Sequence, residues 1–196
     1  VNTIYETDLF TPLIKKVESL SDTKYGAHIE TDYAVRAVAE HARSATFLIA
    51  DGVVPGNEGR GYVLRRLIRR AIRHARRLGI ANECLGGIAE ITIRDMGSIY
   101  PELRNHREFI ITTIQLEEKR FNQAFTSGYA VLEDALQGKN KLEGELVFRL
   151  WDTYGFPVEM TQEICKERGI EVDFEGFQSE MESQRQRARV SGKFTE

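Results

Sequence analysis

Eight arginines lie between residues 60 and 77, and no acidic residue lies among them. The whole chain has 196 residues with 27 basic and 30 acidic side chains, so its net charge of -3 hides this local positive block. A guanidinium presents a planar fork of donors that matches phosphate or carboxylate oxygens. The block therefore predicts either a polyanion such as RNA or DNA, which we favour, or pairing with acids from elsewhere in the fold. Its members are Arg60, Arg65, Arg66, Arg69, Arg70, Arg73, Arg76 and Arg77.

A glycine-rich loop precedes the arginines, over DGVVPGNEGRG at residues 51–61. Proline and glycine at this density break a helix and favour a turn. The loop would deliver the chain to the start of a new helix, where free backbone amides attract anions. This arrangement also favours a phosphate ligand.

Helices are expected to position these residues. Apolar residues recur every three or four positions from about Tyr62 to Leu78, which predicts a helix with the arginines covering much of its remaining surface, and Gly79 as its stop. A long helix is expected over about 103–137, with Glu117–Arg120 on its solvent face. A shorter helix is expected over 143–151, followed by a turn over residues 152–157.

The predicted fold class is all-α, in two helical subdomains. Gly138–Asn140 is predicted to form a hinge-like turn. This turn would separate a helical subdomain with the arginine-rich helix, at 1–138, from a smaller helical subdomain at 139–196. The best strand candidate is 169–172, so at most a minor short strand pair is expected.

Several classes of protein are excluded by composition. Cys84 and Cys165 form no CxxC pair, which argues against a disulfide framework or a cysteine zinc site and favours a cytoplasmic location. No apolar run approaches the roughly 18–20 residues of a membrane span. The N-terminus has no signal-peptide pattern and no initiator Met, and we expect a fragment of a longer protein. The residues suggest no catalytic constellation and no metal site.

Three stretches of the chain have a distinctive sequence, namely HARSATFLIADGVVPGNEGRGYVLRRLIRRAIRHARRLG (41–79), FRLWDTYGFPVEMTQEICKERGIEVD (148–173) and GFQSEMESQRQRAR (176–189). Together they resemble the alanyl-tRNA synthetases, a class II family of aminoacyl-tRNA synthetases. The lead-in YETDLFTPLI (5–14) also looks like the piece that follows the last class II catalytic motif.

The resemblance implies a tRNA-recognition domain. In the family, the adenylation site lies N-terminal to this segment, and the zinc-bearing editing domain lies C-terminal to it. The implied partners are the acceptor stem of alanine tRNA, with its G·U wobble pair, and the catalytic and editing domains of the same chain, with no membrane. The parent enzyme attaches alanine to tRNA using ATP. ATP, Mg²⁺ and Zn²⁺ are expected in the full-length enzyme and none in this segment, which should be inactive alone.

The resemblance also implies two base-reading residues. The family's Asn in a P-x-N-E loop and its Asp before T-Y-G-F-P match Asn57 and Asp152. A carboxylate only accepts hydrogen bonds, which suits the exocyclic amino group of guanine in the minor groove, and an amide can both accept and donate. On the residues alone, Asn57 could instead occupy a left-handed turn position, and Asp152 could cap its turn. Phosphate positioning is expected from Arg60, Arg65, Arg66, Arg69, Arg70 and Arg73.

The chain departs from the family pattern at two places. Gly56 stands where Ser is commoner, and Trp151 stands where Tyr is more usual. Two other functions compete with RNA recognition. One is a helical module that places the arginine helix in the major groove of DNA, and the other is a structural helical module whose arginines pair with acids.

Overall fold

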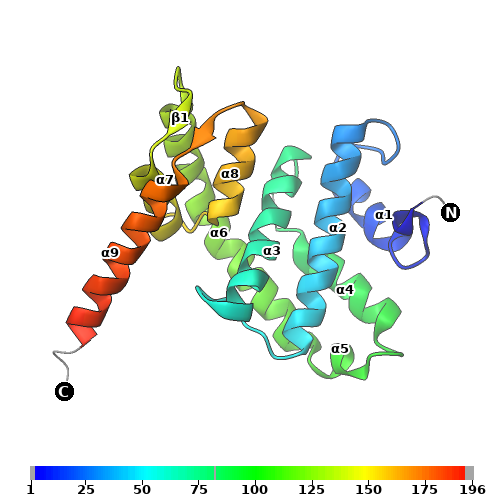
Figure 1. Ribbon diagram of the computed structural model, residues 1–196. Coiled ribbons are helices and arrows are strands. Elements are labelled where there is room, and N and C mark those ends of the chain that lie inside the picture. The colour runs from blue at the N-terminus through cyan, green and yellow to red at the C-terminus, as the bar shows by residue number, and fades with distance from the viewer. Residues whose placement is uncertain (1–2, 82, 193–196) are drawn as a thin grey trace. The chain divides into compact units, whose positions relative to one another are not determined.

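The computed structural model describes residues 3–81 and 83–192, and helices dominate them (Figure 1). The prediction of an all-α fold is confirmed. Within the described part, the chain forms the 3₁₀ turn η1 (Ile4–Glu6), α1 (Thr11–Leu20), α2 (Ile29–Ala50), α3 (Gly59–Arg77), α4 (Leu85–Met96), α5 (Pro101–Asn105), α6 (Arg107–Leu136), β1 (Lys141–Leu142), α7 (Gly144–Asp152), α8 (Val158–Glu167), β2 (Glu171–Val172) and α9 (Phe174–Gly192).

The chain divides into two compact units. The first unit is Val1–Asn122 and the second is Gln123–Glu196, so the division falls within α6. The subdomain boundary at 138–139 suggested by the sequence lies just after the end of α6 at Leu136, in a turn where Gly138 has a φ of 66°, and it stays a prediction.

The first unit is organised around α2 and α3, which lie side by side and run in opposite directions (Figure 1). Leu64, Ile68 and Ile72 on α3 are at most 2% exposed, and they form the buried stripe expected from the sequence. Helix α3 is longer than predicted at its start, because Gly59 already begins it. Beyond its end, Gly79 N–H bonds to the carbonyl of Arg76, and Ile80 N–H bonds to that of Ala75. This pair of bonds is a Schellman motif, so the predicted stop at Gly79 is confirmed.

The long helix expected over 103–137 is two helices. Helix α5 ends at Asn105, and α6 begins at Arg107. Between them, His106 Nδ1 lies 3.0 Å from the carbonyl oxygen of Ala50, the last residue of α2. This contact ties the α5–α6 junction to the end of α2, from which the glycine-rich loop departs.

The second unit contains the only strand pair of the described residues. Strands β1 and β2 run parallel, with Lys141 opposite Glu171 and Leu142 opposite Val172. The predicted strand near 169–172 and the limit of one short pair are therefore confirmed. Helix α7 packs against α9 and α8, and Phe156, Val147 and Leu150 are fully buried in this unit.

Candidate nucleic-acid interface

The loop between α2 and α3 presents Asn57 to solvent. The amide of Gly56 donates to the carbonyl oxygen of Gly61 at 3.0 Å, which closes the loop around Asn57. The Oδ1 atom of Asn57 accepts a hydrogen bond from Nη1 of Arg65, on the second turn of α3. Within the described residues, no residue other than glycine has a positive φ, so the alternative that Asn57 occupies a left-handed position is wrong.

Asp152 belongs to the second unit and is exposed there. It is the last residue of α7, whereas the sequence assigned it to the following turn, and the turn begins at Thr153 instead. Its Oδ1 accepts a hydrogen bond from Nε2 of Gln184 in α9, at 2.8 Å. Within the described residues this carboxylate caps no amide of the turn, so the capping alternative is not supported either.

Aromatic residues on both sides of Asp152 in the sequence pack within the second unit. The ring of Phe156 is fully buried and stacks on Phe125, with centroids 5.6 Å apart. Trp151 contacts Phe148 and Phe177, with centroids 5.9 and 6.5 Å away. The indole of Trp151 therefore makes these ring contacts without the hydroxyl that a tyrosine at position 151 would carry.

The eight arginines of α3 do not form one uniform surface. Arg60 and Arg77 are exposed, and four more are half-buried. Arg69 and Arg73 are 8% and 4% exposed, so their side chains lie mainly inside the first unit. Of the six arginines predicted to position phosphates, these two are therefore the least accessible. The half-buried residues are Arg65, Arg66, Arg70 and Arg76.

Glu117 on α6 is an acid that meets this helix. Its Oε1 lies 2.7 Å from Nε and 2.5 Å from Nη2 of Arg69, and 3.4 Å from Nε of Arg65. The guanidinium of Arg69 also lies over the ring of Phe121, 5.0 Å from its centroid. Part of the positive block is thus neutralised inside the fold, as the structural alternative required.

The expectation that Glu117–Arg120 marks a solvent face is wrong at its first two positions. Glu117 and Glu118 are 2% and 1% exposed. Glu118 accepts hydrogen bonds from the amides of Cys84 and Leu85, at 2.8 and 3.2 Å, and so caps the start of α4. Burial raises the pKa of the Glu118 carboxyl. Sequence periodicity missed Glu117, and the only signal for it was the excess of unpaired arginines that required acids.

Two buried histidines, His74 on α3 and His41 on α2, stay uncharged at neutral pH. Burial, with Arg73 and Arg70 nearby, lowers the pKa of His74 to about 3. Burial and Arg70 lower the pKa of His41 to about 4. At neutral pH the positive charge along α3 therefore comes from its arginine side chains and not from these histidines.

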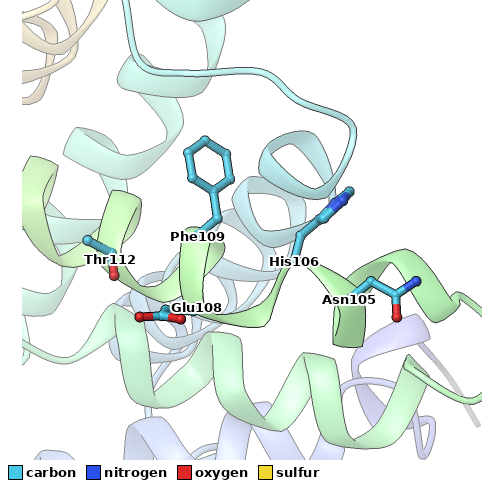
Figure 2. Close-up of a pocket in the computed structure, with 5 residues that line it drawn as sticks. All are labelled: Asn105, His106, Glu108, Phe109 and Thr112. Atoms are coloured by element: carbon cyan, nitrogen blue, oxygen red, sulfur yellow. The ribbon is translucent and has the colours of Figure 1, made fainter.

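A hollow of about 430 Å³ opens at the α5–α6 junction, lined by Asn105, His106, Glu108, Phe109 and Thr112. Figure 2 shows these side chains spread around the start of α6 and not converging on one point. Such an arrangement offers no set of polar groups for chemistry on a small molecule.

No group of three or more His, Cys, Asp or Glu side chains in the described residues is arranged to hold a metal ion. None of the helices there combines the length and apolarity needed to cross a membrane.

Comparison with known proteins identifies the family. The sequence model of the family of class II (A) tRNA synthetases matches residues 1–196 of this chain. The chain is 48% identical over 194 residues to an alanine–tRNA ligase of Dehalococcoides mccartyi, covering 98% of this chain and 22% of that protein. It is 44% identical to the corresponding ligase of Halalkalibacterium halodurans and 46% identical to that of Neisseria meningitidis, covering 97% and 99% of this chain and 22% of each relative.

The chain belongs to the class II (A) tRNA synthetase family. It spans about a fifth of the length of the curated relatives it matches, each of which is an alanine–tRNA ligase.

Proposed function

We propose that this chain is the part of an alanine–tRNA ligase that binds the acceptor stem of alanine tRNA and reads its G·U wobble pair from the minor groove. One observation carries the proposal. An exposed amide, Asn57, stands in a closed loop at the start of a helix that carries eight arginines and no acid. The curated relatives, which are alanine–tRNA ligases, support the choice of tRNA as the polyanion.

Base reading falls to Asn57 and Asp152. A wobble pair leaves the amino group of guanine without its usual partner, and that group is the one donor that guanine displays in the minor groove. Asp152 offers only acceptor oxygens, and both residues are exposed in their own units. The RNA minor groove is wide and shallow enough for side chains to reach it. One such contact is worth roughly 1–3 kcal/mol of discrimination.

Phosphate positioning falls mainly to the more accessible arginines. Arg60 is exposed at the first turn of α3, and Arg66 and Arg70 are half-buried further along it. Arg69 and Arg73 are buried, and in this proposal they support the helix from within and add to its field.

The reaction itself belongs to other parts of the ligase. We propose that the complete enzyme attaches alanine to tRNA using ATP and Mg²⁺ in a catalytic domain, and that an editing domain holds Zn²⁺. This chain would bind none of them and would be inactive alone. Its free, buried cysteines fit a cytoplasmic protein.

The experiment measures binding of the 196-residue chain to acceptor minihelices with G·U or G·C at the reading position, across a range of salt. We expect a steep fall in affinity with salt, because phosphate contacts release counterions. We also expect the G·U helix to bind more tightly, by about tenfold. Asn57→Ala and Asp152→Asn should each reduce that preference, whereas Asp134→Asn, an exposed control in the second unit, should keep it.

Three outcomes would reject the proposal. Equal binding of both minihelices by the unaltered chain would remove the base-reading role. Tighter binding to a DNA duplex of the same sequence would favour a DNA-binding module instead. Absence of any salt-dependent binding, in the chain and in the complete ligase, would favour a structural module.

A further inference from the structure

The contact with Arg65 is compatible with only one orientation of the Asn57 side-chain amide. Its Oδ1 receives a hydrogen bond from Nη1 of Arg65. A guanidinium carries donors and no acceptor, so Arg65 can only bind the oxygen end of the amide. The Nδ2 end therefore faces away from Arg65, and within the described residues it has no hydrogen-bond partner.

Arg65 is itself paired with an acid of the interior. Its Nε lies 3.4 Å from Oε1 of Glu117, which is an ion pair without a hydrogen bond, and its side chain is 21% exposed while that of Glu117 is 2% exposed. Since Glu117 is buried and also accepts a hydrogen bond from Arg69, its carboxylate has little freedom to move. All four residues belong to the first unit. A continuous polar chain thus runs from buried Arg69 through Glu117 and Arg65 to exposed Asn57.

We propose that Arg65 and Glu117 are positioning residues that fix Asn57 as a hydrogen-bond donor toward the RNA minor groove. This inference rests on the proposed function, because it assumes that Asn57 meets RNA. With its oxygen occupied, Asn57 presents two N–H groups, which suit an acceptor such as a pyrimidine O2. Asp152 is then left as the acceptor for the guanine amino group.

The physical gain is preorganisation. An exposed asparagine is free to turn its amide over, and half of those orientations would present an oxygen to an acceptor on the RNA. Holding the oxygen on Arg65 removes that choice before binding, so less ordering is needed on contact with RNA. Arg65 thus influences base discrimination through Asn57, separately from any attraction of its charge to phosphate.

The test separates orientation from charge. Arg65→Lys keeps the positive charge but loses the fork that can bridge Glu117 and Asn57. Binding of G·U and G·C minihelices is measured at fixed salt and across salt. We expect Arg65→Lys to reduce the G·U preference by about fivefold while the salt slope stays nearly unchanged. Arg104→Lys, the same change at an exposed site on α5, should keep the preference.

A double-mutant cycle decides whether Arg65 acts through Asn57. In the Asn57→Ala background, Arg65→Lys should cause no further loss of G·U preference, because the amide it orients is gone. Glu117→Gln keeps the shape of the side chain but removes its charge, and it should reduce the preference in the same non-additive way. Additive losses would overturn the proposal.

The failures of the two proposals are distinguishable. If Asn57→Ala abolishes the G·U preference while Arg65→Lys leaves it intact, the positioning role is wrong and the proposed function stands. If the unaltered chain shows no preference, the proposed function has failed. A readout without RNA guards against unfolding: ¹⁵N relaxation of the Asn57 side-chain amide should show restricted motion in the unaltered chain and faster motion in Arg65→Lys. Equal mobility in both proteins would also overturn the positioning role.

Discussion

The backbone of Gly61 lies directly against that of Gly56, whose amide donates to the Gly61 carbonyl oxygen at 3.0 Å. A Cβ atom on Gly61 would lie 2.7 Å from the carbonyl oxygen of Val54 and 3.0 Å from the Gly56 nitrogen. These distances are too short for a side chain, so the closed loop around Asn57 requires glycine at position 61.

Gly61→Ala should therefore open the loop and reduce the G·U preference of minihelix binding by about fivefold. Gly56→Ser is the matched control, because a Cβ there would lie no closer than 3.7 Å to the Cα of Gly61. It should leave both the preference and the stability nearly unchanged, which agrees with Ser as the commoner residue at this place in the resembled family. A Gly61→Ala protein with an intact preference would show that loop closure does not hold Asn57.

A second glycine lets α6 approach the turn after Asp152. A Cβ on Gly128 would lie 2.7 Å from Cε2 of Phe156 and 2.8 Å from Cβ of Tyr154. Gly128→Ala should lower the free energy of unfolding of the second unit by about 1–3 kcal/mol, because the buried Phe156 ring cannot retreat without strain. Urea denaturation followed by Trp151 fluorescence measures this directly. No loss of stability would mean that the contact relaxes freely.

Buried and exposed arginines of α3 should differ in their effect on stability. Arg69→Met leaves the Glu117 carboxylate buried without its closest partner, and breaking such a buried pair costs about 3–5 kcal/mol. The same change at exposed Arg60 should alter stability by less than about 0.5 kcal/mol. Thermal unfolding of both variants provides the comparison, and equal effects would contradict the assignment of Arg69 to an interior role.

The helices and the surface loop could be predicted from the sequence, whereas the burial of charged side chains could not. Period-3.6 patterning located α3, because Leu64, Ile68 and Ile72 alternate with arginines along it. The same method placed Glu117 and Glu118 in solvent, because a local pattern treats any charged residue as exposed. Their burial depends on donors supplied by other elements, namely Arg69 on α3 and the first amides of α4.

The candidate site shows the same division. Asn57 and Asp152 were singled out by resemblance and not by chemistry, since an isolated Asn or Asp in a turn-rich segment usually has a local role. Nothing in the spacing of Asn57 and Arg65 predicted their contact, which depends on how the loop folds back over the second turn of α3. Likewise, the break between α5 and α6 at His106 follows from a bond to Ala50, fifty-six residues away in sequence.

The buried histidine of α3 makes stability depend on pH in a defined direction. His74 is 1% exposed, packs edge-on against Tyr33 and makes no hydrogen bond through either ring nitrogen. Burial, with Arg73 and Arg70 adding repulsion, lowers its pKa from 6.5 to about 3. In the unfolded chain the ring binds a proton below its ordinary pKa, while in the folded chain it stays neutral. This ring therefore leaves the free energy of unfolding undiminished above pH 6.5 and lowers it progressively as the pH falls from 6.5 toward 3.

The free energy of unfolding should thus fall by about 1.4 kcal/mol per pH unit from this residue in that window. His74→Met removes this titration. The free energy of unfolding of the variant should therefore fall less steeply between pH 6.5 and 5.0 than that of the unaltered chain, by up to about 1.4 kcal/mol per pH unit. Urea denaturation at a series of pH values measures both slopes. His28→Met, at an exposed position, is the control and should keep the original slope. An unchanged slope in His74→Met would mean that the ring takes up its proton in the folded protein.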